Sequence, residues 1–181
     1  MYIAEQLKKK SVAEYLLYMW QVEDTLRAYG LDTEKMATEY IPQFGLDDEK
    51  SAELKGWYEN LIQMMREEGV TEQGHLQVNK NILILLTDLH TQLLKSPKHP
   101  FYSAAYYKAL PFIVELRAKS TESQEKNEIE NCFDALYGTM LLRAQKKEIS
   151  AETATAIDNI AKLVGMLSDY YRKDKEGDVE F

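Results

Sequence analysis

Apolar residues recur at helical spacing along nearly the whole chain, and no stretch alternates between apolar and polar positions as a half-buried strand would. The clearest helix covers residues 11–29, where Ser11 and Glu14 form a capping-box pattern at its start. Apolar residues fill one wide arc of this helix, and Leu16 and Trp20 fall outside that arc. The pattern therefore predicts a central helix that contacts neighbours on more than one side.

Start and stop signals predict six further helices after this one. The seven predicted helices cover residues 11–29, 33–41, 48–68, 71–95, 101–119, 121–147 and 150–174. Thr71 is the expected cap of the fourth helix, and Thr121 that of the sixth. Pro111 lacks the N–H that would bond to the carbonyl of Tyr107, so the fifth helix is expected to be kinked or broken there.

Short connections between the predicted helices favour antiparallel packing. A chain of 181 residues fits one domain and is long enough to bury a sizeable core. We therefore predict an all-α fold, a single-domain antiparallel bundle of about seven helices over residues 1–181. In this prediction, residues 1–10 are an N-terminal arm and residues 174–181 are a frayed acidic tail.

Composition and charge narrow the possible partners and locations. The net charge is −8, whereas binding to nucleic acid or to an anionic membrane surface requires clustered Lys and Arg, so we expect neither partner. The longest aliphatic run, Ile82–Leu86, is far shorter than the roughly 18 residues that suggest a membrane span. The first residues do not resemble a secretory signal, and the single cysteine, Cys132, allows no intrachain disulfide. We therefore expect a cytoplasmic protein.

Two polar residues of the fourth predicted helix fall in the middle of its apolar arc. Asn79 and His90 are therefore expected to be buried and to need hydrogen-bond partners. One interpretation of His90 is a histidine whose hydrogen bonds are satisfied within the core. The other is an imidazole oriented by a carboxylate such as Glu14 or Asp134, which would make an acid–base or ligand-binding group.

The first predicted helix carries a narrow polar ridge, made by Glu14 and Gln21 beside Tyr18. This ridge is either a solvated stripe or the polar lining of a pocket between helices. Glu23 and Arg27 lie four residues apart and are expected to pair with each other on the far side of the helix.

The sixth predicted helix places Glu130 and Asp134 one turn apart, close to Tyr137. Two carboxylates on one turn can bind a divalent cation, although such pairs are more often a solvated margin. A single Glu-x-x-His match, Glu72 and His75, lacks the second copy that a di-iron bundle needs. His-Glu-x-x-His, Walker, Gly-x-Gly-x-x-Gly and Gly-x-Ser-x-Gly motifs are absent, so we predict no metal and no cofactor.

Residues 100–112 are rich in aromatic side chains, which are favoured both at interfaces and at pocket rims. The aromatic residues are Phe101, Tyr102, Tyr106, Tyr107 and Phe112. Although the edge of the core is their ordinary place, they could support a homodimer or the docking of another protein.

Two stretches resemble a known family. The runs are IAEQLKKK followed by SVAEYLLYMWQVEDTLRAYGLD at residues 3–32, and ILILLTDLHTQLL at residues 82–94. They are similar to a family of uncharacterised all-helical bacterial proteins of similar length, known mainly as a domain of unknown function from Bacteroidetes-type bacteria. The resemblance implies a stand-alone cytoplasmic protein and supplies no reaction, cofactor or catalytic residue.

The favoured function is non-catalytic: protein–protein interaction, or binding of a small molecule between the helices predicted at 11–29, 71–95 and 121–147. The alternative is a metal-dependent or acid–base hydrolase that uses His90 with carboxylates of neighbouring helices. The candidate ligand-binding residues are Glu14, Tyr18, Gln21, Asn79, His90, Asp134 and Tyr137.

Overall fold

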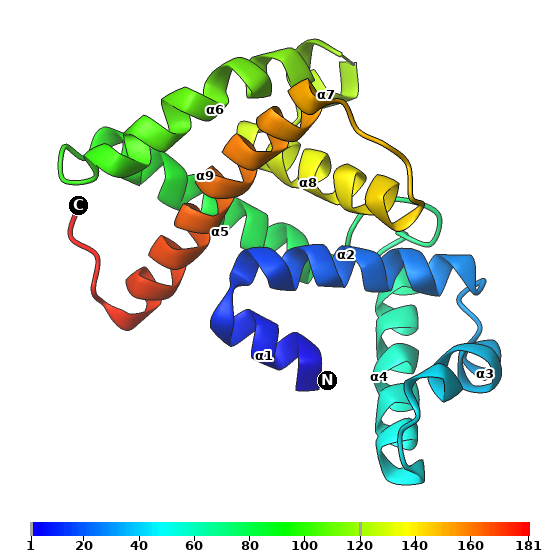
Figure 1. The fold of residues 1–181 in the computed structure, drawn as a ribbon. Helices are drawn as coiled ribbons and strands as arrows, with labels where there is room; N and C mark the ends of the chain where they lie inside the picture. The colour runs from blue at the N-terminus through cyan, green and yellow to red at the C-terminus, as the bar shows by residue number, and fades with distance from the viewer. Residues whose placement is uncertain (1, 120) are drawn as a thin grey trace.

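The computed structural model describes residues 2–119 and 121–181, in which every regular element is helical (Figure 1). The elements are α1 (Tyr2–Lys10), α2 (Val12–Ala28), α3 (Thr33–Lys35), η1 (Met36–Tyr40), η2 (Ile41–Phe44), α4 (Asp48–Glu67), α5 (Gln77–Lys95), α6 (Pro100–Ala118), α7 (Thr121–Glu125), α8 (Glu128–Ala144) and α9 (Ala151–Glu176). The all-α prediction is confirmed. No helix in these residues has the length and apolar character required to pass through a bilayer.

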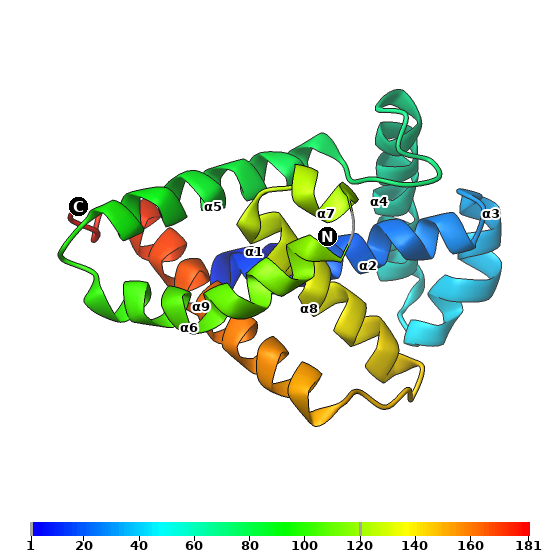
Figure 2. The same ribbon diagram turned by 90° about the horizontal axis from the view of Figure 1, so that it is seen from above.

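Helix α2 is central, as its two apolar surfaces predict. It contacts α1, α4, α8 and α9, and both Leu16 and Trp20 are fully buried. Helices α5, α6, α8 and α9 pack together on one side of the molecule, while α4 and the short elements 33–44 lie beyond the C-terminal half of α2 (Figures 1 and 2). Buried apolar residues from α1 through α9 form one continuous core.

The two chain ends differ from the expected arm and tail. Residues 2–10 form helix α1, with Ala4 buried in the core; Met1 lies outside the described residues. Helix α9 continues to Glu176 and ends at Gly177, whose positive φ of 79° suits a helix C-terminus. The last residues leave the helix and lie against the start of α6, where His99 Nε2 donates to the Glu180 carbonyl oxygen at 2.9 Å.

Three local predictions about helix ends and breaks are tested by the structure. Ser11 caps α2 by accepting from the Glu14 N–H, but its own N–H bonds to the Leu7 carbonyl, so the reciprocal half of the capping box does not form. Helix α6 runs unbroken through Pro111, whose ring lies on the exposed face. The sixth predicted helix is divided into α7 and α8 because Asn127 starts a new helix, its side chain accepting from the Glu130 N–H at 2.9 Å.

The largest boundary error concerns α5. Thr71 was the expected cap, but the helix starts at Gln77, and residues 68–76 form a loop in which Gly69 and Gly74 have positive φ. The N-cap residue, Leu76, has no side-chain cap of its own. Two backbone N–H groups at this end bond to glutamate side chains from outside the helix: Leu76 to Glu23, and Gln77 to Glu68.

Candidate functional site

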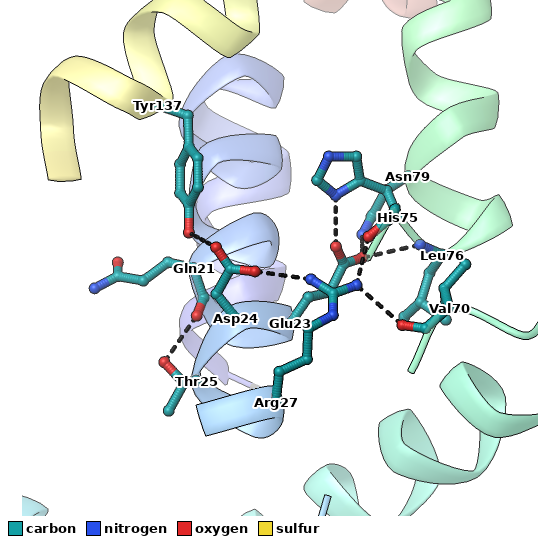
Figure 3. Close-up of polar contacts among 11 residues, drawn as sticks. Gln21, Glu23, Asp24, Thr25, Arg27, Val70, His75, Leu76, Asn79 and Tyr137 are labelled. Carbon is teal, nitrogen blue, oxygen red and sulfur yellow. Dashed lines mark hydrogen bonds and ion pairs between the residues drawn. The ribbon is translucent and has the colours of Figure 1, made fainter. Parts of the chain in front are cut away.

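Glu23 on α2 is fully buried and serves as the missing cap of α5. Its Oε1 accepts from the Leu76 N–H at 3.0 Å and from Asn79 Nδ2 at 2.7 Å, and its Oε2 accepts from His75 Nδ1 at 2.6 Å (Figure 3). A carboxylate is favoured here because the N-terminus of a helix carries partial positive charge. We call Glu23, His75, Leu76 and Asn79 the Glu23 cluster.

Trp20, one turn before Glu23 on α2, stacks against the face of the His75 imidazole. The two rings stack with centroids 4.0 Å apart and planes within 10°. Trp20 also packs edge-on against Tyr137 of α8, at 5.7 Å. The stack and the carboxylate together fix the orientation of His75, whose side chain is 25% exposed.

A second set of polar contacts surrounds the Glu23 cluster. Arg27 does not pair with Glu23, as the spacing suggested; its guanidinium bonds to Asp24 at 2.7 Å and to the Val70 carbonyl at 3.0 Å. Asp24 also accepts from the Tyr137 hydroxyl at 2.7 Å, and burial together with this hydrogen bond raises the pKa of Tyr137. These contacts tie α2 to α8 and to the loop before α5 (Figure 3).

His90, in the C-terminal half of α5, belongs to a different site. It is only 6% exposed, and its Nδ1 lies 2.6 Å from the hydroxyl of Tyr102, a fully buried residue of α6. Burial lowers the pKa of His90, while the charge of Glu128 acts in the opposite direction. The lowered pKa favours the neutral imidazole at pH 7, and one ring nitrogen is already engaged by a phenol.

A groove of about 490 Å³ lies beside His90, between α5, α6 and the start of α8. It is lined by Thr87, His90, Thr91, Leu94, Lys95, Tyr106, Arg117, Asn127, Glu128 and Ile129. Within it, the Tyr106 hydroxyl donates to Glu128 at 2.9 Å, and burial together with this contact raises the pKa of Tyr106 to about 12. We call this cavity the His90 groove.

The structure separates residues that the sequence analysis placed near His90. Asn79 and His90 are both buried with hydrogen-bond partners, as predicted, but they occupy the two different sites. Glu14 and Gln21 are exposed on α2, and Tyr18 is half-buried against the core. The contact of His90 with Glu14 that one interpretation allowed is therefore not formed, and the carboxylate among the residues that line its groove is Glu128.

Asp134 does not meet His90 either. It forms an ion pair with Lys126 at 2.9 Å, and Lys126 pairs at the same distance with Glu122. An ammonium group thus sits where the paired carboxylates of α8 suggested a divalent cation. Across residues 2–119 and 121–181, no group of three or more His, Cys, Asp or Glu side chains is placed to hold a metal ion.

The sequence pattern did not predict the roles of two residues of the site, Glu23 and His75. The spacing of Glu23 and Arg27 predicts a surface ion pair. However, Glu23 lies on the same helical face as Leu16 and Trp20, and this shared face is the sequence signal that indicates burial of Glu23. His75 was dismissed with the chance Glu-x-x-His match; Glu72 is exposed, and the carboxylate partner of His75 is Glu23.

Comparison with known proteins identifies the family of this chain but no relative of known function. No curated protein and no solved structure matches the chain. A family model described as a domain of unknown function (DUF4924) matches residues 1–178, nearly the whole chain, in agreement with the resemblance seen at residues 3–32 and 82–94. The protein therefore belongs to the DUF4924 family.

Proposed function

We propose that the protein is a non-catalytic binder of a small, largely apolar carboxylic acid, which it holds in the His90 groove. The observation that carries this proposal is the position of His90: a buried, neutral imidazole lines a cavity of about 490 Å³ while its Nδ1 is fixed by Tyr102. A concave, mostly apolar site with a few placed polar groups is the usual form of a small-molecule site.

His90 supplies one directional contact. When the Tyr102 hydroxyl donates to Nδ1, the imidazole proton resides on Nε2, which then is a hydrogen-bond donor for a ligand. No hydrogen bond from Nε2 is present among the described residues. Burial also raises the pKa of Tyr102, so its hydroxyl keeps its proton at neutral pH and can donate to Nδ1.

The charges around the groove favour an acidic ligand. Lys95 and Arg117 contribute two positive charges to the lining, whereas its one carboxylate, Glu128, already accepts from Tyr106. Leu94 and Ile129 offer apolar contact for the hydrocarbon part of the ligand. A ligand whose carboxylate lies near the basic groups or near His90 Nε2, and whose hydrocarbon part lies along Leu94 and Ile129, matches both the charge and the apolar lining of the groove.

Calorimetric titration with octanoate and phenylacetate, and with octanol and 2-phenylethanol as uncharged counterparts, tests this proposal. We expect the acids to bind and the alcohols to bind about tenfold more weakly, because they lose a charge-assisted contact. His90→Asn keeps a group that can bond Tyr102 but removes Nε2, and it should weaken acid binding with little change in stability. Equal binding of acids and alcohols, or unchanged binding by His90→Asn, would contradict the proposal.

Protonation of His90 should also be visible in the stability of the protein. Its pKa is lowered from 6.5 in the fold, so below that pH the unfolded chain binds a proton that the folded protein does not. The free energy of unfolding should therefore fall as the pH drops from 7.5 to 5.5. Urea unfolding at both pH values should show a smaller fall for His90→Asn; an identical fall would show that His90 is not the titrating group.

The hydrolase alternative has less geometric support at His90, because the one carboxylate in its groove is engaged by Tyr106. The carboxylate-oriented imidazole that acid–base chemistry favours is His75, bonded to buried Glu23. Hydrolysis of p-nitrophenyl acetate that disappears in His90→Asn or His75→Gln would support the alternative over the binding function.

We further infer that the protein is bacterial and cytoplasmic, that residues 1–181 act as one domain, and that it forms a homodimer. The location is supported by Cys132, a free thiol that is fully buried and whose pKa burial raises to about 12. Such a thiol is protected from oxidation and forms no disulfide. The acidic net charge of −8 supports a chain that binds neither nucleic acid nor an anionic membrane.

A further inference from the structure

A small cavity of about 170 Å³ lies where the turn between α1 and α2 faces the C-terminal half of α9 (Figure 1). Most of the charged side chains in its lining are cationic. They comprise five cations and one carboxylate: Lys8, Lys9, Lys10, Arg172, Lys175 and Glu176. This concentration of positive charge stands out in a chain whose net charge is −8. We call this site the basic cavity.

The positive charge of the basic cavity is largely uncompensated. Its one carboxylate pairs with its guanidinium at 3.3 Å, and none of its four lysines forms an ion pair with a described residue. The Lys8 ammonium lies 5.4 Å from the centre of the Tyr15 ring. The Lys175 ammonium lies 5.5 Å from the centre of the Tyr171 ring. A ring in this position attracts an ammonium group but does not neutralise it, so the charge remains available to an anion.

Two serine hydroxyls in the wall of the basic cavity provide a hydrogen-bond donor. Ser11 Oγ and Ser168 Oγ lie 3.2 Å apart, and Ser168 is only 4% exposed. Each oxygen also accepts a backbone N–H from the first turn of α2, that of Glu14 at Ser11 and that of Ala13 at Ser168. Whichever hydroxyl donates to the other, the second one keeps a proton for which no described residue provides an acceptor. An anionic oxygen in the cavity can accept that proton.

We propose that the basic cavity binds a soluble small molecule through a phosphate or diphosphate group. Such a group presents several anionic oxygens in a compact volume, so it can contact ammonium groups, the Arg172 guanidinium and the free serine proton together. The partial positive charge at the start of α2 acts in the same direction. The small volume of the cavity and the acidic charge of the whole chain favour a small ligand, because nucleic acid and anionic membranes require a more extended basic surface.

Calorimetric titration with inorganic pyrophosphate tests the site, with citrate as a carboxylate anion of comparable charge near neutral pH. Pyrophosphate should bind saturably at low ionic strength, and citrate should bind about tenfold more weakly or less. Lys9→Gln combined with Lys175→Gln should weaken pyrophosphate binding about tenfold or more, because two of the ammonium groups are lost. Lys146→Gln combined with Lys147→Gln removes the same charge from the exposed loop before α9 and should leave binding unchanged. Absence of pyrophosphate binding, equal binding of citrate, or equal losses in the two double variants would overturn the proposal.

The same titration tests the contribution of the hydroxyl pair. Ser11→Ala combined with Ser168→Ala should weaken pyrophosphate binding about tenfold, since a hydrogen bond to a charged group is lost. Circular dichroism checks that this variant is folded. Unchanged affinity in the folded variant would overturn the assigned geometry.

Two further measurements identify the source of the phosphate group and the location of its site. Vesicles of phosphatidylcholine and phosphatidic acid present the same group on a membrane, and the protein should not cosediment with them; cosedimentation would overturn a soluble ligand. The basic cavity and the His90 groove share no lining residue. Arg117→Gln, which removes a positive charge from that groove, should therefore leave pyrophosphate binding unchanged, and a loss would place the anion in the wrong site. Failure of this proposal leaves the octanoate site standing, and the reverse also holds.

Discussion

Replacing Glu23 with alanine is expected to lower the free energy of unfolding by about 3 to 5 kcal/mol, the range found when one partner of a buried charged network is removed. The substitution leaves the Leu76 N–H, Asn79 Nδ2 and His75 Nδ1 without their acceptor, and the first two of these are buried. It also removes the carboxylate that accepts from the Leu76 N–H, at the positive end of α5. Urea unfolding followed by circular dichroism measures the loss.

Glu14→Ala is the matched control, because it removes a glutamate from the same helix at an exposed position. We expect it to change stability by about 0.5 kcal/mol or less. Hydrogen exchange adds a local readout: in Glu23→Ala the amides of Leu76 and Asn79 should lose protection before the rest of α5 does. Similar losses of stability in the two variants would show that Glu23 does not hold the start of α5.

Trp20→Ala is expected to cost about 3 to 5 kcal/mol, the usual range for removing a large buried aromatic ring. Trp20 fills the space between α2 and α8, where it meets Phe133 and Tyr137, and it supports His75 by stacking. The indole Nε1 is buried without a hydrogen-bond partner among the described residues, so the cost arises from packing rather than from a lost hydrogen bond. Thermal or urea unfolding measures it.

Trp57→Ala on α4 provides the comparison, since Trp57 is only half-buried. Its loss should be about half as large or less, because less apolar area returns to water. A double substitution that combines Trp20→Ala with His75→Gln should cost less than the sum of the two single changes, because both remove the same stack. Strict additivity would contradict a direct interaction between the two rings.

The sequence was sufficient to predict the fold class because helical periodicity is a local signal. The two-sided apolar pattern of residues 11–29 correctly predicted a central helix, and the apolar arc of α5 correctly placed Asn79 and His90 inside the protein. The start of α5 could not be predicted in the same way. Its cap is provided by Glu23, more than 50 positions earlier, and local capping rules consider only neighbouring residues.

The partners of the buried polar residues were also beyond sequence reasoning. Helical periodicity says that His90 faces inward, but the choice between Tyr102 and a carboxylate depends on how α5 packs against α6 and α8. Likewise, the pairing of Asp134 with Lys126 depends on the break between α7 and α8, which brings Lys126 back toward the helix. In both cases the pattern along one helix predicted burial or spacing, whereas the identity of the hydrogen-bond or ion-pair partner depends on contacts between helices.

The proposed binding function depends on the protonation state of His90, and long-range ¹H–¹⁵N NMR of the histidine rings observes that state directly. The chain has three histidines, so His75 and His99 are internal references for His90. At pH 7 we expect a neutral His90 with its proton on Nε2, and a saturable shift of that nitrogen when octanoate is added, with His75 and His99 unchanged. A charged His90, or an octanoate response that leaves the His90 nitrogens unmoved, would contradict the proposed site.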